Sequence, residues 1–583
     1  MKTKRTLRLL PLIVLNAVFL IFASFTARGT GENYKDWDYT PTSVFGLVKL
    51  ENTSNRSFYK ITRIDNQSTR VQEYNPAGIV INTTVVRFFN GNLKLVTETD
   101  QWGKTYQTTK FTFLGNGTFN VTETNTGKNS NLPCKLVKYI YRNNLLAEKR
   151  YISYSGKLCN NAYGFAITKY KRFTDKNRFS LIMEQSFYGP DGSPVMAASY
   201  DCHKFTYRRD ERGNDISVAY FGINDEPLTN RYGGFKYKYT YDQDDNNIML
   251  ENIGLNEEVT ANSSGVAKYE YSYTNGFLAT ETRYNQNNQM SRTSATGDGA
   301  AFIKNEHDDR GNVTRISYYN ENLQPINNNS GYQKIVYTYS PSNMLTSIEY
   351  FDKSQLPAAD VYGIHRYGYE KDDKNRVTQV AYFDKNNNPV INNTDQVYMI
   401  KYAYDELGRQ SSESYWKDAT TKMQRWNGYH KYMIKYNQDG QDIEVLYFDE
   451  NGNLSKTNDG YSRRLISYYP NANLSEISFF DDKIPIVTNG ALVSNYHAIK
   501  YFYDNNNRRA SIEYFDGEGK PANASIAFTD KFSCHKIEFM YKGNRIVQEN
   551  CYLANSDTPV KVIDCLTNNY ISTMGISYGY KNQ

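Results

Sequence analysis

Short runs of aromatic and β-branched residues alternate with short polar clusters along most of this chain. Residues 501–521 show the pattern in full: an apolar run, a polar cluster over 504–508, and a second run in which Ile512 and Tyr514 alternate with polar residues. A period of two predicts a strand with one buried face. Two such strands joined by a short polar cluster predict a β-hairpin.

This hairpin recurs at a nearly fixed step. Tyr-Phe-Asp, or a close relative, starts at Tyr220, Tyr318, Tyr350, Tyr382, Tyr447, Phe479 and Tyr514, with weaker copies at Phe187, Asn252, Arg283, Tyr415 and Cys551. We call these residues anchors. Consecutive anchors are 31 to 37 residues apart. Such a step predicts a tandem array with one continuous core. The predicted fold is therefore all-β, with repeats of about 32 residues forming an extended twisted sheet or a β-solenoid.

The columns of the repeat predict which side chains are buried. Val or Ile stands two residues before each clear anchor and shares its strand face, so we assign both columns to the core. The residue after the anchor, usually Phe, points to the opposite face, where either the following loop or another layer covers it. Pro often follows seven residues after the anchor, outside the strands.

The two ends of the chain depart from the repeat. Residues 1–29 have a basic start and a long apolar run, which predicts a cleaved signal peptide or an uncleaved membrane anchor. Residues 30–160 predict a separate β region with hairpin units of about 25 residues, and residues 161–550 hold the main array. Residues 551–583 predict a capping unit that protects the last edge strand. We expect a secreted, periplasmic or cell-surface protein.

Charge narrows the choice of partners. The chain has 68 Lys and Arg against 62 Asp and Glu, and five of the basic residues lie in the leader. Without the leader the chain is close to neutral and has no dense basic run. Nucleic acid and anionic membrane surfaces are therefore not expected partners, and the protein would meet a membrane only through an uncleaved leader.

The cysteines allow disulfides in an exported protein. None of the six forms a Cys-x-x-Cys pair, and the nearest pairs in sequence are Cys134 with Cys159 and Cys551 with Cys565. Buried free thiols are the alternative.

Three acidic turns match the first half of a calcium-binding loop but lack its final bidentate Glu. Their candidate ligands are Asp242, Asp244, Asp384, Asn386, Asp449 and Asn451. Turn formation is the favoured explanation, because Asp and Asn side chains bond nearby backbone.

No motif for catalysis, phosphate binding or metal binding occurs. We expect no cofactor, and nothing in the sequence argues for an enzyme. The histidines lack metal-site spacing, and His365, His430 and His497 fall at roughly corresponding positions of the repeat.

The segment YAYDELGR at 402–409 resembles the YD repeat of Rhs-type proteins, and the Tyr-Phe-Asp half of the unit is similar to MORN-type hairpins. This resemblance implies an exported array of hairpins, but the 32-residue step is longer than the YD period.

Three function classes remain open. The favoured one is an exported or surface-attached scaffold that binds a protein or a glycan. The others are a structural or shell-like part of an envelope or toxin assembly, and an enzyme with a site on non-repeating loops. For the scaffold we predict a binding row of exposed tyrosines at Tyr367, Tyr402, Tyr436 and Tyr501. The alternative is that these rings are buried cross-strand partners of the anchors.

Overall fold

The computed structural model describes residues 31–564 except 126–127, 130–133, 135, 154, 173–181, 199, 294–296, 471–472, 491–492, 505–507, 528–530 and 543–544. The described residues form strands, turns and loops and include no helix, so they contain none that could span a bilayer. The all-β prediction is confirmed: tandem antiparallel hairpins form an extended sheet. The leader over 1–29 and Cys565 lie outside the described residues, as does most of the predicted cap.

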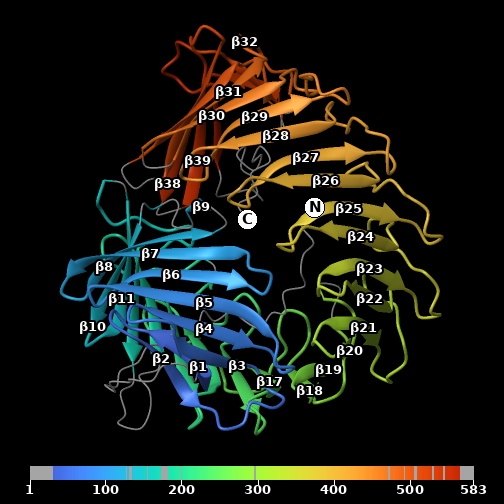
Figure 1. Cartoon of the computed structure of the whole chain (residues 1–583). Coiled ribbons are helices and arrows are strands. Elements are labelled where there is room, and N and C mark those ends of the chain that lie inside the picture. The colour runs from blue at the N-terminus through green and yellow to red at the C-terminus, as the bar shows by residue number, and fades with distance from the viewer. Residues whose placement is uncertain are drawn as a thin grey trace. The chain divides into compact units, whose positions relative to one another are not determined.

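The chain divides into two compact units, Met1–Met399 and Ile400–Gln583, and the division falls inside the repeat array (Figure 1). The first unit begins with a sheet in which β1 lies between β2 and β3 and the later strands follow in chain order to β8. Its strands are β1 Glu32–Tyr39, β2 Val44–Lys49, β3 Phe58–Arg63, β4 Ser68–Tyr74, β5 Val80–Phe89, β6 Asn92–Asp100, β7 Thr105–Gly115, β8 Thr118–Asn125 and β9 Lys128–Asn129.

The same sheet continues into the repeats, because β8 pairs with β10 and each later strand of this unit pairs with the next. These strands are β10 Leu136–Arg142, β11 Leu145–Ile152, β12 Ile167–Arg172, β13 Ile182–Tyr188, β14 Lys204–Arg209, β15 Asp215–Phe221, β16 Lys236–Tyr241, β17 Asn247–Ile253, β18 Lys268–Thr274, β19 Phe277–Tyr284, β20 Phe302–His307, β21 Val313–Tyr319, β22 Lys334–Tyr339, β23 Leu345–Phe351, β24 Arg366–Lys371 and β25 Val377–Phe383.

The second unit repeats the hairpin pattern, with β27 to β31, β34, β35, β38, β39 and β40 paired in that order. A small separate sheet joins β33, β36 and β37. The strands are β26 Met399–Tyr404, β27 Gln410–Trp416, β28 Lys431–Tyr436, β29 Asp442–Phe448, β30 Arg463–Tyr468, β31 Leu474–Asp481, β32 Ile484–Pro485, β33 Val493–Ser494, β34 Ala498–Tyr503, β35 Arg509–Phe515, β36 Ala524–Ala527, β37 Lys531–Cys534, β38 Lys536–Lys542, β39 Arg545–Tyr552 and β40 Lys561–Asp564.

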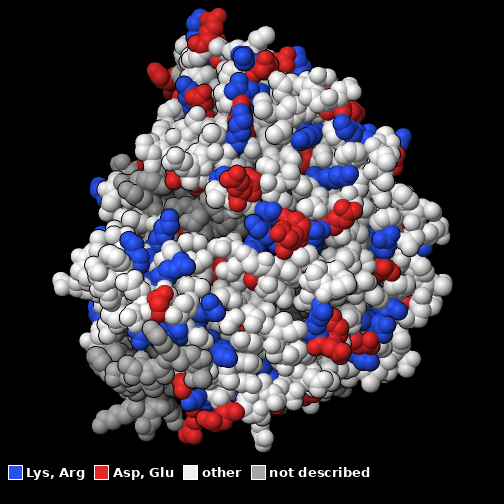
Figure 2. All heavy atoms as spheres, in the orientation of Figure 1, with Lys and Arg blue, Asp and Glu red and all other residues white. Residues whose placement is uncertain are grey.

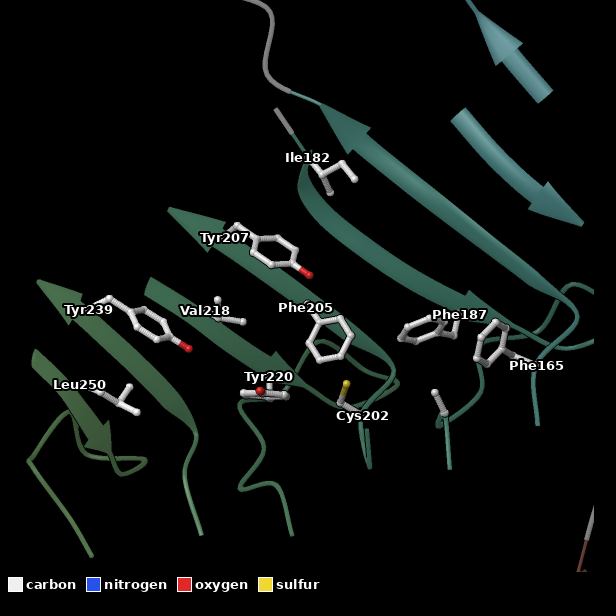
Figure 3. Packing of buried hydrophobic residues seen from close by; sticks show 11 residues of the cluster. Phe165, Ile182, Phe187, Cys202, Phe205, Tyr207, Val218, Tyr220, Tyr239 and Leu250 are labelled. Carbon is white, nitrogen blue, oxygen red and sulfur yellow. The ribbon is translucent and has the colours of Figure 1, made fainter. Parts of the chain in front are cut away.

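The core lies on one face of the hairpins. We number the first strand of each hairpin from its first residue, so that position 2 pairs with the anchor, as Tyr367 pairs with Tyr382. Anchors such as Phe187 and Tyr415 are completely buried, which confirms the predicted core column. Figure 3 shows this packing over β12 to β17, where Phe187, Phe205 and Tyr220 lie on a common face.

A typical repeat makes three tight turns, and the same chemistry can close all three. In one repeat the Oδ1 atoms of Asp352, Asp360 and Asp372 each accept hydrogen bonds from the backbone N–H groups two and four residues later, at 2.8–3.1 Å. The third residue after each Asp is left-handed, with φ of 65° at Gln355, 81° at Gly363 and 56° at Asn375. This explains why Asp, Asn and Gly punctuate the whole chain.

The loop after each anchor folds back along the strand that precedes it. The residue after the anchor forms an antiparallel bridge with the residue six positions later, as Phe351 does with Pro357. The loops then hydrogen-bond to one another from repeat to repeat: Ser263 N donates to Tyr232 O at 2.9 Å and Asn458 N to Asn427 O at 3.0 Å. The sequence predicted that either a loop or another layer covers the residue after the anchor. The structure shows that the folded loop lies there.

Tyrosine at position 6 ties each hairpin to the one before it. Its hydroxyl donates to the backbone carbonyl of the first residue of the preceding strand, at 2.8–3.1 Å. The pairs are Tyr241 with Asp215, Tyr273 with Asn247, Tyr339 with Val313, Tyr436 with Gln410 and Tyr468 with Asp442. In the segment 402–409, the following Asp405 accepts from Arg409 Nε at 2.6 Å, and the Arg409 guanidinium lies 4.5 Å from the ring of Tyr436 in the next hairpin. Asp405 and Arg409 of this motif thus hold the turn and contact the next hairpin.

Turns of the N-terminal sheet contact a row of hairpin turns in the same unit. Arg56 pairs with Asp244 at 2.8 Å, the Asn75 amide donates to Arg310 O at 2.8 Å, and Trp102 Nε1 donates to Ser342 O at 3.2 Å. The partner turns are separated by roughly one or two repeats, so the N-terminal sheet runs along the array and contacts several hairpins.

Candidate binding face

The face opposite the core carries a row of aromatic rings covered by cations. The ring belongs to the residue after the anchor, and the cation stands at position 1 or 3 of the first strand of the hairpin. We call each such pair of a cation and a ring a rung. The rungs are Lys169–Tyr188, Lys204–Phe221, Lys268–Tyr284, Lys334–Phe351 and Arg366–Phe383 in the first unit, and Lys401–Trp416, Lys500–Phe515 and Lys536–Tyr552 in the second, with cation-to-ring distances of 3.5–5.4 Å. The rings are half-buried.

A second ring packs edge-on against many rungs. It comes from position 0, the residue just before the first strand, and is usually His. His203, His365, His430, His497 and His535 all take this place, with ring centroids 4.9–5.6 Å from the aromatic ring. Phe235 and Tyr398 occupy it in other repeats. The repeat therefore explains five of the six histidines, and the described residues contain no metal-ligand cluster.

A cavity of about 370 Å³ lies beside the Lys401–Trp416 rung of the second unit. Trp416 at the end of β27 and Phe448 at the end of β29 lie on its two sides. Lys422, His430 and Lys431 also line the cavity. The Trp416 indole N–H donates to the hydroxyl of Ser414, another lining residue, at 3.2 Å. This volume lies in the usual range for small-ligand sites.

The protonation state of His430 determines whether its ring can accept a hydrogen bond in this cavity. Burial, together with the nearby charge of Lys422, lowers the pKa of His430 from its ordinary value. Its Nδ1 lies 3.2 Å from Met423 O, and a carbonyl can only accept, so Nδ1 carries the proton. In the neutral ring Nε2 is therefore a hydrogen-bond acceptor.

The cavity is electropositive at short range. Lys422 and Lys431 are its cations, and Asp449 is its one lining acid among the described residues. Asp449 Oδ1 accepts from the N–H groups of Asn451 and Asn453 at 2.9 and 2.8 Å, and these bonds lower the pKa of its carboxyl. On the face in Figure 2, by contrast, positive and negative side chains are intermingled without a large region of one sign.

The predicted tyrosine row is not exposed, and it is not a row of equivalent residues. Tyr367 and Tyr501 are buried, with 7% and 6% of their surface exposed, and Tyr402 and Tyr436 are half-buried. They stand at positions 2, 4, 6 and 4 of their strands. All even positions face the core, so the alternative that these rings are structural describes their packing correctly.

The candidate calcium ligands occupy turns. Asp242 Oδ1 accepts from Asp244 N and Asn246 N at 2.9 Å each, and Asp384 Oδ1 accepts from Asn386 N and Asn388 N at 2.8 Å each. Asp449 and Asn451 form the equivalent turn. The Oδ1 atoms of Asp242, Asp384 and Asp449 accept from backbone N–H groups, which agrees with the favoured turn interpretation.

Sequence reasoning also named Cys134 with Cys159, and the structure joins these two by a disulfide. It did not find the rungs or the cavity. A signal was available, because Lys or Arg stands at position 1 in most repeats, at the same step as the aromatic residue that faces it.

No family model and no curated protein matches the chain. Among solved structures, TcdB2-TccC3 without its hypervariable C-terminal region aligns over 91% of this chain and 30% of that chain, at 12% identity and a TM-score of 0.30. The Photorhabdus luminescens Tc holotoxin pore aligns over 88% and 33%, at 9% identity and 0.17. A porin-like protein from Bacteroides uniformis aligns over 49% and 90%, at 9% identity and 0.14. The chain thus spans about a third of the two toxin chains, and likeness of this degree carries no functional argument.

Proposed function

We propose that this protein is an exported β-repeat scaffold that binds an acidic glycan on the rung face. The observation that carries the proposal is the cavity between Trp416 and Phe448. It combines aromatic rings, two lysine ammonium groups and the Nε2 acceptor of His430 in a volume suited to one sugar ring. Amphipathic rings that pack against sugars, with a few placed polar groups, are typical of such sites.

Each group in the cavity matches a feature of a uronic acid. The aromatic side chains can contact the C–H face of the sugar ring, and His430 Nε2 can accept a hydrogen bond from a sugar hydroxyl. Lys422 and Lys431 can donate charge-assisted hydrogen bonds to the carboxylate. A neutral sugar would leave both ammonium groups without that partner.

The rung spacing supports an extended ligand. Rungs of neighbouring hairpins are separated by two strand spacings, about 9.5 Å. A linear polysaccharide crossing the strands would pass a cation and an aromatic ring at each hairpin that carries a rung. Export is proposed from the apolar leader and from the Cys134–Cys159 disulfide, a bond characteristic of oxidising compartments.

Calorimetry with uronic-acid hexasaccharides, and with neutral glucose hexasaccharides of equal length, tests this proposal. The double substitution Lys422→Gln and Lys431→Gln removes the two cations, and Lys520→Gln, at an exposed ion pair with Glu518 that belongs to no rung, is the control. Loss of a charge-assisted hydrogen bond costs about 1.5–3 kcal/mol, so we expect the double variant to bind the acidic ligand at least 10- to 100-fold more weakly. Equal affinity in the double variant, or equal binding of both ligands, would refute the proposal.

A further inference from the structure

Two buried cysteines occupy a pair of positions that the repeat always brings together. Cys534 ends β37, immediately before His535, and therefore stands at position −1 of its hairpin. Cys551 is the anchor of the same hairpin, because it pairs with Ile537 at position 2. Both side chains are completely buried.

In other repeats, aromatic rings at position −1 and at the anchor are in contact. The centroid distances are 4.6 Å for Tyr332–Tyr350, 4.7 Å for Tyr429–Tyr447, 4.8 Å for Tyr461–Phe479 and 5.1 Å for Tyr496–Tyr514. The backbone geometry of the hairpin thus directs these two side chains toward each other whatever their identity. Two thiols fill much less of this space than two tyrosines.

We infer that Cys534 and Cys551 form a disulfide that replaces the aromatic pair in this hairpin. In the structure both residues are free thiols, and the interaction of Cys534 with Cys551, together with burial, raises the pKa of Cys534 above its ordinary value. A buried thiol of this kind reacts slowly, because the thiolate is the reactive form. The bond would therefore form while the chain folds, before the hairpin closes around the two sulfur atoms.

The oxidation is balanced by a disulfide donor, such as a dithiol–disulfide oxidoreductase or a small disulfide in an oxidising compartment. The two protein thiols lose two protons and two electrons and gain one S–S bond. The donor disulfide takes up both protons and both electrons and leaves as two thiols.

The position of this bond parallels the one disulfide already present. Cys134 is also at position −1, since Val137 at position 2 of β10 pairs with the anchor-equivalent residue Tyr151. Its partner Cys159 lies in the loop that folds back from that hairpin. Position −1 would then carry a disulfide in both hairpins, through Cys134 in the one that begins with β10 and through Cys534 in the one that begins with β38. Cys202, the third residue of this type at position −1, faces an anchor that is tyrosine and is a free thiol.

Peptide mapping of the full chain, exported or refolded with oxidised glutathione and alkylated without reduction, tests this inference. We expect a cross-linked peptide containing Cys534 and Cys551, with Cys202 alkylated. The result that overturns it is alkylation of both Cys534 and Cys551, or a Cys551–Cys565 linkage.

A variant provides a second measurement. Cys534→Tyr with Cys551→Tyr rebuilds the pair seen at Tyr496–Tyr514, so its unfolding temperature should respond less to a reductant than that of the natural chain. Closing a loop of this length gives about 3 kcal/mol, so reduction should lower the melting of the natural chain by roughly 6–12 °C more than that of the variant. Cys202→Ser is the control, and it should keep both the cross-link and the larger response. Equal responses of the natural chain and the tyrosine variant would contradict the inference.

Discussion

Arg283 occupies an anchor position where other repeats have an aromatic ring, and its burial depends on an acid supplied by an irregular loop. Its Nη2 lies 2.9 Å from Asp298 Oδ2, its Nε lies 2.7 Å from Glu281 Oε1, and its Nη1 donates to Ala300 O at 3.1 Å. Only 9% of the Arg283 side chain is exposed. Removing one partner of a buried ion pair costs about 3–5 kcal/mol. Because Glu281 remains, we expect about 3 kcal/mol for Asp298→Asn.

Hydrogen exchange of the amides in β19 and β20 measures this cost locally. A loss of about 3 kcal/mol corresponds to protection factors lower by roughly 100- to 200-fold. Glu321→Gln breaks the exposed pair with Arg292 in the next repeat and should change protection by less than about threefold.

The double variant Arg283→Tyr with Asp298→Asn supplies the decisive comparison. It removes the buried charge together with its partner and restores the ring found at Tyr318 and Tyr350, so most of the lost protection should return. The reasoning fails if Asp298→Asn leaves protection unchanged, or if the double variant is as weakly protected as the single one.

Three further results are expected. Tyr241→Phe and Tyr339→Phe each remove one inter-hairpin hydrogen bond, so each should lower the urea-unfolding free energy by about 1 kcal/mol and the pair should be additive; an unchanged double variant would show that the hydroxyls contribute nothing. Burial raises the pKa of Asp36 to about 6, above its unfolded value of 3.8, so stability should be greatest below pH 4 and fall by about 2–3 kcal/mol as the pH rises through 6; Asp36→Asn should flatten this part of the pH profile, and an identical profile would refute it. Arg56→Ala breaks the ion pairs with the turn at 242–246 and should increase exchange in β3 while leaving β28 unchanged; equal protection in β3 would show that the contact is not stabilising.

The hairpins, their register and the buried anchors could be predicted from sequence because a strand has a strict period of two. The anchor and the residue two positions before it must share a strand face. The 32-residue step repeats this arrangement along the chain. The same period explains why the four predicted tyrosines are not exposed. Tyr367, Tyr402, Tyr436 and Tyr501 all stand at even positions, where parity directs them to the core.

Contacts between different repeats cannot be predicted in this way, because no sequence period marks them. The role of Asp298 follows from a folded loop that returns to Arg283, and the cavity is lined by residues of two successive hairpins. The proximity of Cys534 to Cys551 became visible only through the equivalent tyrosine pairs. The nearest-neighbour rule for cysteines found Cys134 with Cys159 because a single loop connects them.

The contacts between the N-terminal sheet and the hairpin turns have a consequence for folding. Arg56 meets Asp244, Asn75 meets Arg310 and Trp102 meets Ser342, so the partners are separated by 188, 235 and 240 residues. Contacts so distant in sequence form slowly, because the chain must close a long loop before any of them stabilises it. At a synthesis rate of roughly 5–20 residues per second, the N-terminal turns emerge about 10–50 s before their partners. During that interval these side chains lack their distant partners, and a chain interrupted before residue 244 would leave all three docking contacts unmade.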